Sequence, residues 1–91
     1  MLKNRIHPGE FLQEELRARG VSQSQLAEHI GVGAGVINLI CNARRGISPQ
    51  MAKKLGAALG TTAELWINLQ VSYDLTRAAD PSFGKLRASD A

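Results

Sequence analysis

The stretch LAEHIGVGAGVINLICNA, residues 26–43, limits how this chain can fold more than any other part of it. Gly31 follows Ala27 by four residues, and a glycine there permits the left-handed turn that ends one helix. A small side chain at position 27 lets the next helix approach closely. Five apolar residues fall where they would wedge the two helices together: Leu26, Ile30, Val32, Ile37 and Ile40. The spacing predicts a helix-turn-helix, although an αα-hairpin has the same outline.

Helix start and stop signals predict further helices on both sides of this motif, and strand signals are absent. Pro8 and Glu10 suit a first helical turn, because proline lacks the amide that is unpaired there and the carboxylate complements the helix dipole. Residues 22–25 and residues 61–64 each match a capping box, and a serine followed by a proline at 48–49 suits another helix start. The predicted helices cover about residues 8–19, 22–30, 34–42, 48–59 and 61–77.

These helices predict an all-α fold with one five-helix, repressor-like helix-turn-helix domain over residues 1–78. Asp80–Gly84 interrupt the helical periodicity, so residues 79–91 are expected to form a flexible tail. A chain of 91 residues with 44% hydrophobic residues is large enough for one core, and it carries no second domain.

Composition excludes several classes of function. One cysteine, Cys41, allows no internal disulfide and no cysteine-rich zinc site, and Glu28 and His29 lack the second histidine that a metal site would need. No serine or cysteine has a visible partner base, so no enzymatic activity, metal or cofactor is expected. No apolar stretch approaches a membrane span and the start lacks a signal-peptide core, which favours a cytoplasmic protein. The net charge of +3 suits a polyanionic partner without requiring one.

The second helix of the motif has two faces. Projected at 100° per residue, Val36, Ile37 and Ile40 face the core. The opposite face would meet the major groove of DNA and contact bases through Ala34, Gly35, Asn38 and Leu39. On this face only the asparagine can read an adenine edge, while the alanine and the leucine can touch thymine methyl groups. A glycine at position 35 either marks a helix start or lets the backbone approach DNA closely.

Residues around this helix are positioned for phosphate contacts. The expected phosphate-binding residues are Gln23, Asn42, Arg44 and Arg45. Such contacts fix register and supply affinity without carrying sequence information. An exposed basic turn is the alternative interpretation of the two arginines, but their position directly after the groove-facing helix favours phosphate binding. The motif is therefore predicted to bind DNA with weak direct base readout.

The fifth predicted helix has two apolar stripes. One stripe, expected to join the core, consists of Leu65, Trp66, Leu69 and Tyr73. The second consists of Ile67, Val71 and Leu75. A surface helix normally has one stripe, so the second needs a cover, either the tail through Phe83 and Leu86 or a two-fold partner. We favour a homodimer, which predicts an inverted-repeat operator with half-sites about one DNA turn, or a multiple, apart.

Three runs of the sequence resemble the HigA-type antitoxins, a branch of the helix-turn-helix proteins related to phage repressors. They are HPGEFLQEEL at residues 7–16, SQSQLAEHIGV at residues 22–32, and RRGISPQMAKKLGAALGTTAELWINLQVSYDL from residue 44 to residue 75. The resemblance covers about residues 6–77. It implies a five-helix all-α fold, homodimerisation, binding to the protein's own operator, and neutralisation of a RelE-like (HigB) toxin that cuts mRNA on the ribosome. The chain departs from the family pattern at Gly33 and Gly35, where polar groove-facing residues are usual, and at Ala43, where glycine is usual.

Three functions remain open at the level of sequence. The first is an antitoxin that represses its own promoter and binds a toxin. The second is a free-standing repressor without a toxin, and the third is a toxin-binding inhibitor whose DNA reading has decayed. The sparse groove-facing surface favours the third, whereas the family resemblance favours the first.

Overall fold

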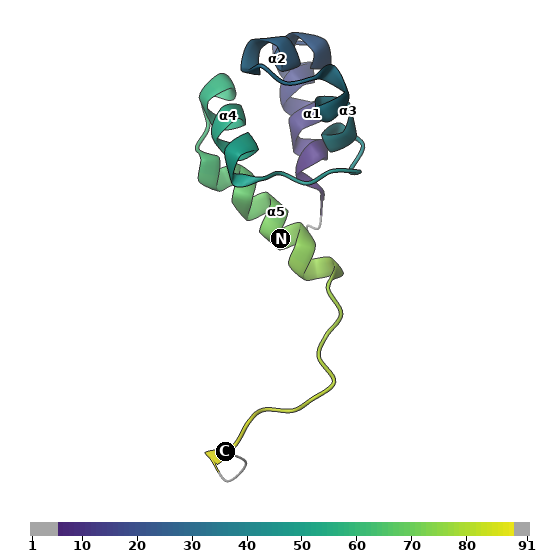
Figure 1. Cartoon of the computed structure of the whole chain (residues 1–91), viewed down its shortest axis with the longest axis vertical. Coiled ribbons are helices and arrows are strands. Elements are labelled where there is room, and N and C mark those ends of the chain that lie inside the picture. Colours follow the sequence, from purple (N-terminus) through teal and green to yellow (C-terminus); the bar gives the residue numbers. More distant parts are fainter. Residues whose placement is uncertain (1–5, 89–91) are drawn as a thin grey trace.

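A computed structural model describes residues 6–88. Within these residues the chain forms five α-helices and no strand, as the sequence predicts (Figure 1). The helices are α1 (Pro8–Arg19), α2 (Gln23–Ile30), α3 (Ala34–Cys41), α4 (Pro49–Leu59) and α5 (Ala63–Arg77). The predicted domain and tail boundaries also include residues 1–5 and 89–91, which lie outside the described residues.

The helix starts follow local side-chain chemistry, with one correction. Ser22 and Gln25 form the predicted capping box of α2, and the hydroxyl of Ser48 accepts a hydrogen bond from the amide of Met51 at the start of α4. The predicted capping box of residues 61–64 is wrong. Thr62 is the N-cap of α5, because its hydroxyl accepts a hydrogen bond from the amide of Leu65, while the hydroxyl of Thr61 accepts one from the indole N–H of Trp66.

The start of α1 is fixed by an imidazole. Nδ1 of His7 accepts a hydrogen bond of 2.8 Å from the amide of Gly9, so this side chain is the N-cap of α1. The ring is buried and meets the ring of Tyr73 on α5 edge to face at 4.8 Å. One side chain therefore both begins α1 and joins it to α5.

The contact between α1 and α3 leaves no room for a side chain at position 9. A Cβ atom built on Gly9 would collide with the backbone carbonyl of Ile40, which lies in the last turn of α3. Gln13, one turn further along α1, donates to the carbonyl oxygen of Cys41 at 3.3 Å. The two backbones are thus in direct contact, and α3 is held against α1 at its C-terminal end.

One apolar core lies between the helices, with Trp66 of α5 fully buried in it. Its buried members come from every helix and from the loop before α4: Leu12, Leu16, Leu26, Ala27, Ile37, Ile40, Cys41, Ile47, Met51, Ala52, Leu55, Leu59 and Trp66. The prediction that Val36 packs with Ile37 and Ile40 is confirmed, although Val36 is only half-buried. Ala27 is 2% exposed and belongs to the core, as expected for a small residue where α2 and α3 meet.

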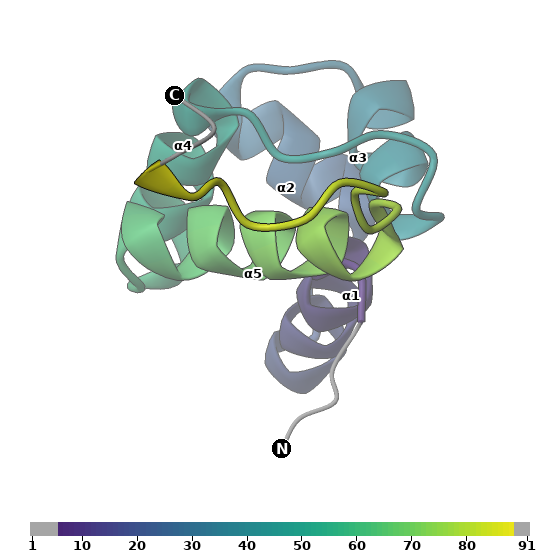
Figure 2. The same ribbon diagram turned by 90° about the horizontal axis from the view of Figure 1, so that it is seen from below.

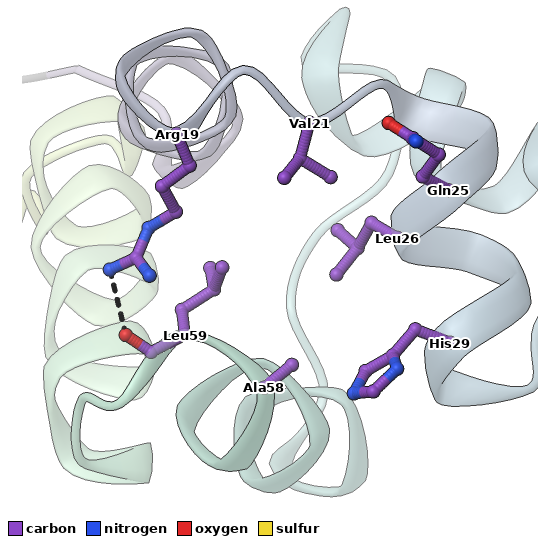
Figure 3. A pocket seen from close by; sticks show the side chains of 7 residues that line it. All are labelled: Arg19, Val21, Gln25, Leu26, His29, Ala58 and Leu59. Carbon is purple, nitrogen blue, oxygen red and sulfur yellow. Dashed lines mark hydrogen bonds between the residues drawn. The ribbon is translucent and has the colours of Figure 1, made fainter.

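Two side-chain-to-backbone bonds join segments that are distant in sequence. Gln70 of α5 accepts a 2.7 Å hydrogen bond from the amide of Ile47 and so fixes the loop between α3 and α4. Arg19, at the end of α1, donates to the carbonyl oxygen of Leu59 at 2.8 Å (Figure 3). This second bond satisfies a carbonyl group at the C-terminus of α4, where the helix itself offers no partner.

The second stripe of α5 is only partly free. Ile67 is half-buried and packs against the core, whereas Val71 and Leu75 are 49% and 71% exposed. Of the stripe expected in the core, Trp66 and Leu69 pack there, while Leu65 and Tyr73 are half-buried.

The segment after α5 does not cover this stripe. It runs away from the helices as extended chain (Figure 1), and Phe83 and Leu86 are 80% and 73% exposed. The exposed part of the stripe, Val71 and Leu75, therefore has no cover within the described residues. Flexibility of the tail stays a prediction.

Replacing Gly9 with alanine should destabilise the fold. The added methyl group must push α1 away from the carbonyl of Ile40, an overpacking cost of about 3 kcal/mol. Chemical denaturation of Gly9→Ala measures the loss. Gly33→Ala is the matched control, since a Cβ atom at that position meets open space. Equal stability of the two variants would contradict the close contact between α1 and α3.

Stability should fall as the pH drops below about 6.5, the ordinary pKa of histidine. Burial lowers the pKa of His7, while Asp74 and Glu10 oppose the shift. The unfolded chain therefore binds a proton before the folded chain does, and protonated Nδ1 cannot accept from Gly9. Unfolding free energy measured from about pH 7.5 to about pH 5.5 should decline in the native protein.

The matched variant for this pH experiment is His7→Asn, which keeps a side-chain acceptor at the N-cap and has no proton to gain. Its unfolding free energy should decline less over the same pH range. An identical pH profile in both proteins would show that His7 does not carry the effect.

Candidate nucleic-acid interface

The exposed face of α3 is the best candidate for a nucleic-acid interface. The helix packs against α2 across the turn at Gly31, whose φ of 75° is left-handed as predicted. The four residues expected to contact bases, Ala34, Gly35, Asn38 and Leu39, are all exposed. The geometry therefore allows the predicted docking of this helix, and whether these residues contact DNA stays a prediction.

Asn38 belongs to a row of hydrogen-bonded amides. Its Nδ2 donates to Oε1 of Gln23 at 3.2 Å, and its Oδ1 accepts from Nδ2 of Asn42 at 3.2 Å. The sequence predicts phosphate contacts for Gln23 and Asn42, and the structure brings both against Asn38, the predicted base reader. The row holds the Asn38 amide plane in one orientation, and each amide still has a free donor or acceptor position.

The start of α3 has no side-chain cap. Gly33 is its N-cap and provides no side-chain hydrogen bond, so the first amides of the helix are left for another acceptor. A Cβ atom at Gly33 or Gly35 would meet nothing, and neither residue has a positive φ. The fold does not require glycine at these two positions. Gly35 lies in the first turn of α3, so it does mark the helix start, and close approach of the backbone to DNA stays a prediction.

Arg44 and Arg45 follow α3 directly and are both exposed. The turn that presents them contains Ala43 at a φ of 60°, the one left-handed residue other than glycine among the described residues. Amides of Ala43 and Arg44 donate back to Ile40 and Leu39, closing the end of α3. A similar return bond follows α1, α2 and α4, and there glycine is the left-handed residue. The family's usual glycine at position 43 is thus explained by backbone conformation.

Sequence reasoning missed the contribution of α4 to this side of the molecule. A hollow between the start of α3 and the start of α4 brings Arg45 together with Gln50 and Lys54. The signal that could have found it is a charge pattern. Residues 29–63 contain no acidic residue and four cations, Arg44, Arg45, Lys53 and Lys54. A segment that includes α3 and α4 and whose charged residues are all cationic is suited to bind a polyanion.

Other chemistry has little support in the described part of the chain. Residues 6–88 hold no group of three histidine, cysteine or acidic side chains that could bind a metal ion. Burial raises the pKa of the Cys41 thiol, which disfavours the reactive thiolate. None of the five helices within these residues has the length and apolar character that a membrane crossing requires.

Three features together define a DNA-binding helix-turn-helix protein. They are the buried alanine where α2 and α3 meet, the exposed face of α3 and the exposed cations beside it. Comparison with known families agrees, since residues 12–66 match the helix-turn-helix model. The chain belongs to this family, and within it to the HigA-type antitoxins, which are DNA-binding proteins rather than enzymes.

The chain is similar to three proteins, two of which are named as HigA antitoxins. Antitoxin HigA-1 of Vibrio cholerae is 40% identical over 71 residues, covering 77% of this chain and 67% of that protein. Virulence-associated protein I of Dichelobacter nodosus is 42% identical over 74 residues, covering 80% of this chain and 68% of that protein. The structure of Pseudomonas aeruginosa antitoxin HigA with the higBA promoter is 42% identical, with a TM-score of 0.77 and coverage of 80% of each chain.

Proposed function

We propose that this chain is an autorepressor that binds operator DNA through α3 in the major groove. The observation that carries the proposal is the exposed face of α3, where Gly33 and Gly35 leave the backbone free to approach a phosphate or a base edge. Asn38, oriented by its two amide neighbours, is the proposed base reader. Arg44, Arg45 and the cations of α4 would supply affinity through phosphates. The structure of Pseudomonas aeruginosa HigA with the higBA promoter supports the proposal that a protein of this kind binds operator DNA.

We further propose that the protein acts as a homodimer on an inverted-repeat operator. Val71 and Leu75 form an exposed apolar stripe on α5 that the tail leaves uncovered. One copy of α3 offers few base contacts, and two copies about one DNA turn apart would double them. A symmetric partner thus accounts for both the uncovered stripe and the sparse groove face.

As an antitoxin, the protein is proposed to neutralise a RelE-like toxin that cuts mRNA. This part of the proposal rests on membership of the HigA-type family and on the name of the Vibrio relative. Because operator DNA and ribosomes are both found in the bacterial cytoplasm, we propose that the protein acts there. The bare face of α3 favours one alternative, a toxin-binding inhibitor whose DNA reading has decayed, and DNA-binding measurements separate the two.

The two kinds of DNA contact should respond differently to substitution. Arg44→Ala combined with Arg45→Ala should weaken binding about equally for operator and scrambled DNA, and should reduce the salt slope by roughly one unit per lost contact. Asn38→Ala should cost about 1–3 kcal/mol at one base pair and leave scrambled DNA unaffected. Fluorescence anisotropy with the DNA upstream of the gene, over a range of salt concentrations, measures both effects.

A matched control for the arginine variant is Arg17→Ala combined with Lys85→Ala, which removes the same charge from α1 and the tail. This control should retain most of the affinity and the full salt slope. An arginine variant that behaves like the control would contradict the phosphate contacts. A wild-type protein that binds the upstream region no better than scrambled DNA would instead support the decayed inhibitor.

The proposed dimer should separate when its stripe is charged. Val71→Glu combined with Leu75→Glu should give a folded monomer that binds operator DNA weakly, because two carboxylates cannot be buried without partners. Analytical ultracentrifugation measures the mass. Phe83→Glu combined with Leu86→Glu makes the same chemical change in the tail and should remain dimeric. The interface is wrong if the stripe variant is still a dimer, and the dimer itself is wrong if the native protein is a monomer at high concentration.

A further inference from the structure

The outer face of α1 carries an apolar groove with an acidic rim. It is a hollow of about 490 Å³ that extends from two residues before α1 to the third turn of the helix, and it is lined by Ile6, Glu10, Phe11, Glu14, Glu15 and Ala18. Ile6 is 44% exposed, and Phe11 is half-buried with its ring 5.2 Å from that of Trp66. The floor is thus apolar and supported from below by the core, while carboxylates form the edge. Such a surface can bury an apolar side chain and pair with a cation beside it.

This groove faces away from the proposed DNA interface. At 100° per residue, Gly9, Leu12 and Leu16 lie on the side of α1 that is buried against α3 and the core. The groove residues of α1 are centred on the opposite side of the helix. Figure 2 shows α1 at the edge of the bundle, projecting past α5 on the side away from the loop between α3 and α4. A partner in the groove would therefore leave α3 accessible.

The charges of the chain are separated in the same way. Residues 29–63 carry four cations and no acidic residue, whereas three of the eight acidic residues line this one groove. Glu10 forms no ion pair among the described residues, and Glu14 has only an exposed contact of 3.7 Å with Arg17. Glu15 is engaged, since it binds Arg19 at 3.1 Å. Two carboxylates are thus available to an incoming cation.

We propose that this α1 groove binds the toxin through a basic segment with an apolar anchor. The inference rests on the proposed antitoxin function and names the surface that carries it. A nuclease that acts on mRNA must bind a polyanion, so its surface has to be cationic. The groove has the complementary charge and an apolar floor for one side chain. Toxin and operator DNA then occupy opposite sides of the protein and bind together.

A second groove in the fold fits such a partner less well. It lies between the end of α1, α2 and α4, and is lined by Arg19, Val21, Gln25, Leu26, His29, Ala58 and Leu59 (Figure 3). Its only charged side chain, Arg19, is cationic and already bound to the carbonyl oxygen of Leu59. A cationic partner gains no charge pairing there. The choice between the two grooves therefore follows from the sign of the charge.

The test uses the full chain and the toxin encoded beside it, expressed together and purified. Glu10→Lys combined with Glu14→Lys should weaken toxin binding by about tenfold or more and abolish rescue of growth. Both side chains are exposed and free of bonds to the core, so the fold should stay intact, which thermal unfolding checks. The matched control is Glu28→Lys combined with Asp80→Lys, with the same net charge and two exposed sites elsewhere. Operator affinity should not fall in either variant.

Each outcome separates the groove from the proposed function. Loss of toxin binding in the groove variant alone, with operator binding retained, supports the inference. Equal toxin binding by the native protein, groove variant and control overturns the groove while leaving the antitoxin function in place. Equal weakening in groove variant and control also overturns it, since net charge would then be the cause. No toxin binding by the native protein overturns the toxin part of the proposed function and the groove with it.

Discussion

The direct contact between the backbones of α1 and α3 is the constraint on which the remaining arrangement depends. Gly9 lies against the carbonyl of Ile40, and no other residue type fits there. His7 fixes where α1 begins and meets Tyr73, so the same short segment orients α1 toward α5. With its C-terminal end fixed in this way, α3 turns its opposite face to solvent. The exposure of Asn38 is thus a consequence of a glycine 29 residues earlier.

Local signals in the sequence are sufficient to predict the helices, but they do not always select the residue that caps a helix. The capping box at Ser22 and the N-cap at Ser48 involve only neighbouring residues, so their patterns predict the structure directly. At 61–62 two threonines are available: Thr62 caps α5 by accepting from the amide of Leu65, and Thr61 accepts from the indole N–H of Trp66. Periodicity finds the two stripes of α5 but cannot tell that Ile67 packs on the core as well.

The exposure of the candidate site was predictable from the sequence, but the hydrogen bonds within it were not. Helical projection alone selects the exposed face of α3, because a short helix against a core has one free side. The amide row from Gln23 through Asn38 to Asn42 crosses from one helix to the next, and no spacing rule reveals it. The α1 groove depends on the packing of Phe11 against α5, so a linear pattern shows only an acidic helix face.

The left-handed turn at Ala43 determines the length of α3. If α3 continued at 100° per residue, Arg44 would lie on the same side as Ile37, Ile40 and Cys41, which face the core. Burying an unpaired guanidinium costs several kcal/mol, whereas holding one alanine at positive φ costs about 1–3 kcal/mol. Ending α3 before Arg44 therefore costs less free energy than continuing the helix through it. The hydration of Arg44 thus accounts for where α3 ends in a chain that has no glycine at position 43.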